Sequence, residues 1–180
     1  MAKIVILDRD GVINHDSEEY IKSPSEWLPI KGSLEAIAHL HRAGYVIVVA
    51  TNQSGIGRNL YTVCALDAIH KKMTDAIESL QGHLAGIFYC PHHPDADCNC
   101  RKPRTGLLDQ ISEFLGNGLQ GTPFIGDSLT DIEAADAFGC KPILVKTGYG
   151  LRTSRSLTEP YPEIFADLHA AALAITNETV

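Results

Sequence analysis

The chain has 180 residues, of which 44% are hydrophobic, so we expect one folded domain over residues 1–180 with a substantial core. Its formal net charge of −7 argues against nonspecific binding to nucleic acid or to an anionic membrane surface. No apolar run approaches the roughly 20 residues that span a bilayer, and no signal peptide precedes the first predicted strand, so we expect a cytoplasmic protein.

The first predicted element is a largely apolar strand over residues 3–7, which we expect to be buried on both faces. It ends at Asp8, and open α/β sheets bind their ligands at the carboxyl ends of such strands. Asp10 follows two residues later, and Gly11 allows a sharp turn. Two carboxylates this close repel each other unless one holds a proton or a cation lies between them, which favours Mg²⁺. A solvated turn is the alternative for this short pattern alone.

Residues 14–31 lack a sustained helical period, and we expect them to form a long loop or small flap. Asp16 and Tyr20 of this flap are placed to contact whatever approaches the two carboxylates of the first strand. A variable surface loop is the alternative. A helix with Ser33 as its N-cap then leads into a second buried strand over residues 45–50, and this strand-helix-strand unit predicts a parallel pair.

A polar segment follows the second strand and contains Thr51, Asn52, Gln53 and Ser54. Its hydroxyls, amides and backbone N–H groups can donate hydrogen bonds to phosphate oxygens. A polar loop with ordinary capping is the alternative. The next two predicted elements are a long amphipathic helix over residues 62–80, whose apolar stripe should be core, and a short strand over residues 84–89.

The loop over residues 90–103 carries a concentration of potential metal ligands. It holds two pairs spaced two residues apart, Cys90 with His92 and Cys98 with Cys100. In extended backbone, residues two apart point the same way, so each pair can present two soft ligands to one ion. Thiolates with an imidazole favour a closed, tetrahedral, structural Zn²⁺ site. His93 is the rival fourth ligand, and free cysteines in a loop are the alternative for the whole group.

Arg101 and Lys102 directly follow the last predicted ligand of this zinc loop. Closing the loop on zinc would therefore fix where the two cations point. A lysine can offset charge on carboxylates and phosphoryl oxygens, whereas an arginine can grip phosphate or sugar oxygens with its planar fork. A solvated basic pair is the alternative.

The closing part of the chain continues the alternation of strands and helices, which predicts a parallel sheet with helices on both faces. A strand over residues 122–126 ends at Asp127, a further candidate metal ligand at a strand end. Asp131 should orient this loop or cap the next helix, and it could also reach a metal through water. The remaining predicted elements are a helix from residue 105 that buries Phe114, a helix ended by Gly139, a last core strand over residues 142–145, a surface loop over residues 146–162 and a terminal helix over residues 161–175.

These motifs, in this order, resemble those of the haloacid dehalogenase superfamily of phosphatases. The resemblance implies a Rossmann-like fold, and the spacing of the motifs leaves no room for a cap domain. It implies that Asp8 attacks phosphorus to give an aspartyl-phosphate, while Asp10 acts as general acid and then as base. It implies that Thr51 and Lys102 hold the phosphoryl group, and that Mg²⁺ is bound by Asp8, Asp127 and the Asp10 carbonyl.

The zinc loop placed just before Arg101 is similar to that of the heptose bisphosphate phosphatases and their relatives, the histidinol-phosphate phosphatases. The resemblance implies removal of the 7-phosphate of a heptose 1,7-bisphosphate on the route to lipopolysaccharide, with Arg101 recognising this small sugar phosphate. We expect the protein to act as a monomer. Histidinol-phosphate phosphatase is the enzymatic alternative, and a zinc-stabilised phosphate-binding module is the non-enzymatic one. A halide-releasing hydrolase is disfavoured, because that chemistry does not use the Mg²⁺-site acids. The expected substrate-binding residues are Asp16, Tyr20, Thr51, Asn52, Gln53, Ser54, Arg101 and Lys102.

Overall fold

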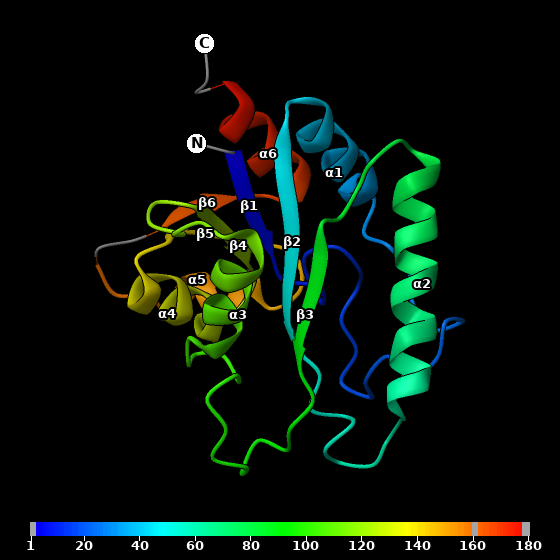
Figure 1. The fold of residues 1–180 in the computed structure, drawn as a ribbon. Coiled ribbons are helices and arrows are strands. Elements are labelled where there is room, and N and C mark those ends of the chain that lie inside the picture. Colours follow the sequence, from blue (N-terminus) through cyan, green and yellow to red (C-terminus); the bar gives the residue numbers. More distant parts are fainter. Residues whose placement is uncertain (1–2, 160–161, 178–180) are drawn as a thin grey trace.

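The computed structural model describes residues 3–159 and 162–177, and its centre is one six-stranded sheet in the order β3-β2-β1-β4-β5-β6 (Figure 1). Every neighbouring pair of strands is parallel, so all carboxyl ends lie at one edge of the sheet. The strands are β1 (Lys3–Leu7), β2 (Tyr45–Asn52), β3 (Gly86–Cys90), β4 (Pro123–Gly126), β5 (Lys141–Val145) and β6 (Glu163–Phe165).

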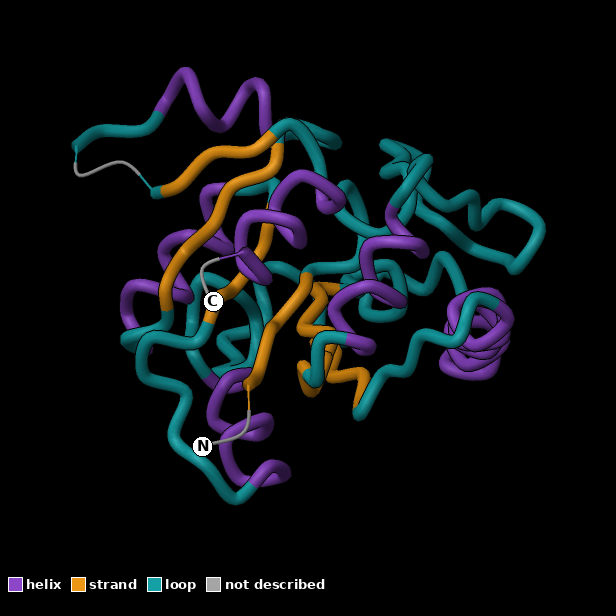
Figure 2. The backbone as a smooth tube through the Cα atoms, turned by 90° about the horizontal axis from the view of Figure 1, so that it is seen from above, coloured by secondary structure: helices purple, strands orange, loops and turns teal. Residues whose placement is uncertain are grey.

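Helices cover both faces of this sheet, as the alternation of apolar segments predicts, and the expected Rossmann-like fold is confirmed. Helices α1, α2 and α6 pack on one face, and α3 and α4 pack on the other. Figure 2 looks down on this arrangement, with α2 seen almost end-on at the periphery. The helices are α1 (Ser33–Arg42), α2 (Val63–Ser79), α3 (Gly106–Leu115), α4 (Leu129–Phe138), α5 (Gly150–Ser156) and α6 (Leu168–Asn177).

The central strand β1 is fully apolar between its ends because alternate side chains enter two different cores. Val5 and Leu7 pack with the helices of one face, whereas Ile4 and Ile6 pack with those of the other. Since successive residues of a strand point to opposite faces, neither side of β1 meets water. The end of β1 is therefore held rigidly between β2 and β4, and so is Asp8, the residue that follows it.

The predicted flap over residues 14–31 is irregular, but it is anchored to the body of the protein. Trp27 is only 1% exposed, and the Lys72 ammonium on α2 donates to its carbonyl oxygen at 3.0 Å. Ser33, which we expected to cap α1, donates instead through Oγ to the carbonyl of Ile13 at 2.6 Å, and the preceding glycine takes the N-cap position. The flap is thus tied at both of its ends.

Three apolar residues that we expected in the core are exposed. Phe114 is 57% exposed, and it packs edge-on against Phe88 of the edge strand β3, with ring centroids 5.4 Å apart. Val63 and Leu80 are 45% and 38% exposed, because they lie at the two ends of α2, beyond its contact with the sheet. The helical period predicted for α2 is correct, but only the middle of its apolar stripe is buried in the core.

The predicted surface loop over residues 146–162 is wrong in part, because it contains α5. The strand β5 is not the last one either, since β6 pairs beside it and becomes the edge of the sheet. A three-residue strand with two exposed side chains has no apolar alternation that could reveal it. Tyr161, the predicted start of the terminal helix, lies outside the described residues, and α6 begins only at Leu168.

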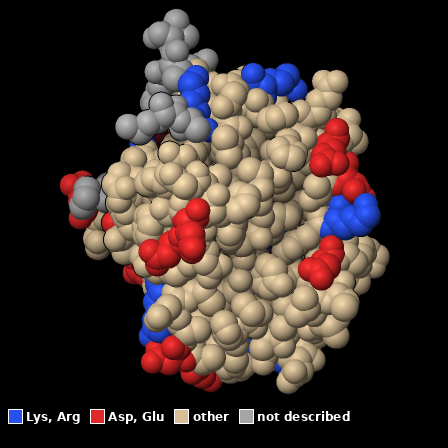
Figure 3. All heavy atoms as spheres, in the orientation of Figure 1, with Lys and Arg blue, Asp and Glu red and all other residues tan. Residues whose placement is uncertain are grey.

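The surface carries its charge in small groups. On the face of the described residues drawn in Figure 3, charged side chains lie in small groups, some of them with acidic and basic side chains side by side, and uncharged surface separates the groups. Among the helices of residues 3–159 and 162–177, none combines the length and the apolar character needed to cross a membrane.

Candidate active site

The carboxyl edge of the sheet, at the lower side of Figure 1, holds a cleft of about 350 Å³. Each motif arrives from a different element: Asp8 from the end of β1, Thr51 from β2, Lys102 from the loop between β3 and α3, and Asp127 from the end of β4. The fold thus brings together side chains that are far apart in the sequence. The expected site residues that line the cleft are Asp8, Asp10, Asp16, Tyr20, Thr51, Asn52, Gln53, Arg101, Lys102 and Asp127.

Lys102 lies at the centre of the charged groups and is almost completely buried. Its ammonium is 3.0 Å from Asp8 Oδ1 and 2.6 Å from Asp131 Oδ1, and it donates to the carbonyl of Ala50 at 2.7 Å. Burial would lower the pKa of Lys102, but the carboxylates of Asp131 and Asp8 outweigh burial and raise it to about 12. The lysine is therefore a permanent cation beside Asp8.

The carboxylates of Asp8, Asp127 and Asp131 lie close together, and Lys102 pairs with Asp8 and Asp131. Burial and the neighbouring Asp131 raise the pKa of Asp8 to about 7, and burial and Asp8 raise the pKa of Asp127 to about 8. Oxygens of the three carboxyl groups lie within 4.8 Å of one another. Hard oxygen ligands with excess negative charge are the donor set that Mg²⁺ prefers, so the residues present fit such an ion.

The position of Asp127 depends on two glycines. A Cβ atom on Gly11 or on Gly148 would collide with the Asp127 carboxylate, and both glycines have positive φ angles. The same carboxylate accepts a hydrogen bond from the backbone N–H of Tyr149 at 2.7 Å. Only residues without side chains allow the two loops to close around Asp127 at this distance.

Asp10 is held by three side chains. The guanidinium of Arg9 donates to Oδ1 at 2.9 Å and to Oδ2 at 3.0 Å, while Asn14 donates to Oδ1 and Gln53 to Oδ2, each at 2.8 Å. Burial would raise the pKa of Asp10, but the charge of Arg9 and these hydrogen bonds outweigh burial and lower it. Asp10 is therefore ionised in this arrangement, and its direction is fixed.

Two amides of the polar segment after β2 bind protein groups as well as lining the cleft. Gln53, expected to line the substrate site, also donates to Thr51 Oγ1 at 2.9 Å and accepts from the Tyr61 hydroxyl at 2.7 Å. Asn52 exchanges two hydrogen bonds with the backbone of Lys102, both at 3.1 Å. Ser54 is buried and is not among the lining residues of the described cleft. These amides position Asp10, Thr51 and the loop after β3.

Arg9 and Tyr61 line the cleft too, although no motif of the sequence indicates either residue. Arg9 lies between Asp8 and Asp10 in the sequence and is only 1% exposed. Its burial indicates a role in the site, but the burial of a single arginine cannot be predicted from the sequence. Arg101 behaves differently, because its Nη1 is buried and has no hydrogen-bond partner among the described residues. A buried donor of this kind is costly unless a ligand satisfies it.

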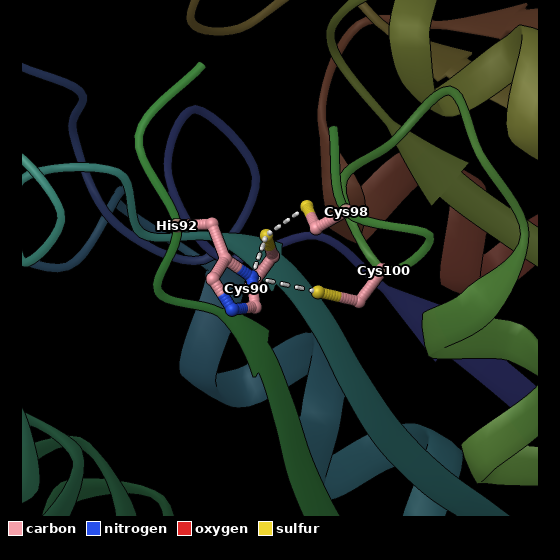
Figure 4. Close-up of side chains that lie close together, drawn as sticks. All are labelled: Cys90, His92, Cys98 and Cys100. Atoms are coloured by element: carbon pink, nitrogen blue, oxygen red, sulfur yellow. Dashed lines mark hydrogen bonds between the residues drawn. The ribbon is translucent and has the colours of Figure 1, made fainter. Parts of the chain in front are cut away.

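The four expected zinc ligands converge on one point in Figure 4. His92 Nδ1 lies 3.2 Å from Cys100 Sγ and 3.6 Å from Cys90 Sγ, and the two sulfurs of Cys90 and Cys98 are 3.7 Å apart. Ligands in a tetrahedron with Zn–S bonds of about 2.3 Å are separated by about 3.8 Å, so the group fits zinc. His93 is not part of this cluster, since its Nδ1 accepts the backbone N–H of Asp95 instead.

The chain is similar to known proteins over most of its length. Residues 99–171 match the HAD-hydrolase-like family. The D-glycero-beta-D-manno-heptose-1,7-bisphosphate 7-phosphatase of Pseudomonas aeruginosa is 51% identical over 175 residues, which are 96% of this chain and 97% of that protein. The enzyme of the same name from Escherichia coli K12 is 37% identical over 160 residues, which are 82% of this chain and 83% of that protein.

Solved structures give the same picture. The D,D-heptose 1.7-bisphosphate phosphatase from B. bronchiseptica, complexed with magnesium and phosphate, is 45% identical and superposes with a TM-score of 0.95, covering 98% of this chain and 99% of that one. The D,D-heptose 1,7-bisphosphate phosphatase from Burkholderia thailandensis is 40% identical, with a TM-score of 0.76 and coverages of 96% and 97%. The similarity therefore extends over nearly the whole length of this chain.

Proposed function

Because this chain belongs to the haloacid dehalogenase-like family of D-glycero-D-manno-heptose-1,7-bisphosphate 7-phosphatases, we propose that it removes the 7-phosphate from that sugar bisphosphate. It is a phosphoric monoester hydrolase, as its named relatives are. The proposal rests mainly on sequence identity: about half of the residues are identical to those of a named phosphatase over nearly the full chain. The cleft, in which Asp8 lies beside the buried Lys102, supports it. The names of these relatives favour the heptose bisphosphate over histidinol phosphate.

The reaction proceeds in two balanced steps. In the first, a carboxylate oxygen of Asp8 bonds to phosphorus, the bond from phosphorus to the sugar oxygen breaks, and the carboxylic acid of Asp10 gives its proton to that oxygen. The incoming phosphate dianion raises the pKa of Asp10, which allows this carboxyl group to hold the proton. In the second, water attacks phosphorus, Asp10 takes a proton from the water, and the bond to Asp8 breaks to release inorganic phosphate.

The other groups of the cleft hold and orient the substrate. Lys102 and Thr51 bind the transferring phosphoryl oxygens, and the unpartnered Nη1 of Arg101 donates to substrate oxygens. Asp16 and Tyr20 form the wall on the flap side and meet the sugar hydroxyls. Asp8, Asp127 and the Asp10 carbonyl would hold Mg²⁺, which offsets the charge of the carboxylates and of the phosphoryl group.

The cluster of Cys90, His92, Cys98 and Cys100 binds a structural zinc ion in this proposal. Burial and the neighbouring Cys90 raise the pKa of Cys100 to about 12, because close thiols cannot all ionise unless a cation lies among them. Zinc would fix the loop that carries Arg101 and Lys102. We further assign the protein to the cytoplasm and to lipopolysaccharide precursor synthesis, acting as a monomer with one domain over residues 1–180.

A panel of phosphate esters tests the substrate. We expect kcat/KM for heptose 1,7-bisphosphate to exceed that for histidinol phosphate by at least about 100-fold, because the site's buried donors match sugar oxygens. Release of phosphate is measured for both anomers of the bisphosphate, for histidinol phosphate and for simple sugar phosphates. Equal or reversed preference would favour the histidinol-phosphate alternative, and phosphate binding without release from any ester would favour the binding module.

Removal of magnesium tests the metal site. Protein freed of Mg²⁺ by dialysis, with its zinc retained, should lose activity and recover it when Mg²⁺ is added. The Asp127→Asn variant should need at least about tenfold more Mg²⁺ for half-maximal activity, since it lacks one charged ligand. Asp136→Asn is the matched control, because Asp136 is exposed on α4. An unchanged Mg²⁺ requirement in Asp127→Asn would remove this residue from the proposed site.

A further inference from the structure

His70 is a buried polar residue that the proposed reaction does not use. It lies on α2, on the apolar face formed with Leu66, Ile69 and Met73, and is 8% exposed. A histidine on such a face requires a hydrogen-bond partner, because an unsatisfied buried polar group is costly.

The partner is Arg9, whose Nη1 is 3.2 Å from His70 Nε2. A guanidinium has only donors, so Nε2 must accept and the imidazole proton must be on Nδ1. Burial, and after it the charge of Arg9, lower the pKa of His70 to about 3, which keeps the ring neutral and able to accept. The ring is also held from the side by Tyr89 of β3, whose ring meets it edge-on at 5.8 Å.

The opposite edge of the same guanidinium binds Asp10. Arg9 Nε and Nη2 donate to Asp10 Oδ1 at 3.1 and 2.9 Å, so one planar group connects the helix α2 to the carboxylate. Arg9 is 1% exposed, and water cannot replace a lost partner easily at that burial. Without an acceptor at position 70, Nη1 would be a buried donor with no partner, and the guanidinium would turn to find one.

We propose that His70 is a positioning residue for the general acid and base: by accepting from Arg9, it fixes the plane in which the guanidinium holds the Asp10 carboxylate. The inference rests on the proposed phosphatase mechanism, in which Asp10 moves the proton. His70 lies on α2, 60 residues further along the chain from Asp10 and outside the segments that carry Asp8, Thr51, Lys102 and Asp127. Small errors in the direction of a proton donor are sufficient to slow proton transfer.

Two substitutions of similar size separate hydrogen bonding from packing. His70→Gln keeps an acceptor that can reach Arg9, so its kcat should stay within about threefold of wild type. His70→Leu fills the space without an acceptor, and its kcat should fall about 10–100-fold while KM changes less than about twofold. Met73→Ala, one turn further along the same face, is the packing control and should lower Tm without this loss of kcat.

A double-mutant cycle with Asp10→Asn tests the route of the effect. If His70 acts through Asp10, His70→Leu should lower kcat by no more than about twofold in the Asp10→Asn background. The same factor in both backgrounds would overturn the inference, as would a His70→Gln variant as slow as His70→Leu.

Imidazole ¹⁵N NMR on the full chain gives a readout that does not depend on activity. We expect His70 to be unprotonated at Nε2 and to show no titration between about pH 5 and 8. A protonated Nε2 would contradict the inference. Failure of the proposed function would be distinct, because the wild-type protein itself would then release no phosphate from any ester.

Discussion

Replacing Asp8 with asparagine should lower kcat for phosphate release by at least about 10⁴-fold. An amide is a poor nucleophile, so the first covalent step should stop while the shape of the site is kept. Asparagine Oδ1 can still accept from the Arg9 N–H and from Lys102, which lie 2.7 and 3.0 Å from the Asp8 oxygen. Intact-protein mass spectrometry after rapid quenching should detect the phosphorylated chain in the wild type and not in the variant.

The same substitution should stabilise the metal-free protein. It removes one of three buried carboxylates that lie close together, those of Asp8, Asp127 and Asp131, so Tm measured in EDTA should increase by about 2–4 °C for each kcal/mol of repulsion removed. Asp67→Asn, exposed on α2, is the control and should change neither activity nor Tm. If Asp8→Asn released phosphate at the wild-type rate, the aspartyl-phosphate route would be wrong.

Replacing Cys98 with serine should abolish zinc binding and lower kcat by at least about 100-fold. Structural zinc sites contribute about 10–16 kcal/mol of binding free energy to folding, and residues 91–103 of the loop form no helix or strand. Without the ion, the backbone N–H and carbonyl of Lys102 should separate from Asn52, and the lysine should lose its position beside Asp8. Metal analysis, kcat and hydrogen exchange over the loop measure the three effects.

Cys64→Ser is the matched control for the zinc site. Cys64 is an exposed free thiol on α2, outside the Cys/His cluster, so its loss should change neither zinc content nor kcat. Purified wild-type protein should contain one zinc ion per chain. A zinc-free Cys98→Ser variant with full activity would show that the loop does not depend on the metal.

Much of the site could be predicted because it is encoded locally. Asp8 and Asp127 each follow a short apolar strand, and parallel strands that alternate with helices deliver their ends to one edge. The spacing of the two cysteine-containing pairs was sufficient to predict that their side chains cluster in the zinc loop. In each case residue type and position along the backbone were sufficient.

The rest of the site depends on the directions in which side chains point, and no sequence pattern specifies these directions. Gln53 was expected to line the substrate site, and it does, but its amide also holds Asp10 and Thr51. Arg9 turns back onto the neighbouring Asp10, which a sequence cannot distinguish from an exposed arginine. His70 stands in an apolar helical stripe, where a histidine normally indicates only packing. The short edge strand β6 has too few residues for any period to be recognised.

Asp131 connects the N-terminus of α4 to the active site, because its two carboxylate oxygens have different partners. Its Oδ2 accepts from the backbone and the hydroxyl of Ser128 at the start of α4, while its Oδ1 pairs with Lys102. During synthesis on the ribosome, a chain that has formed β1 to β3 but not α4 would pair Lys102 with Asp8 alone, because Asp131 lies on α4. We therefore expect phosphatase activity only after the final third of the chain has folded onto the rest. A truncated translation product that lacks this part should be inactive.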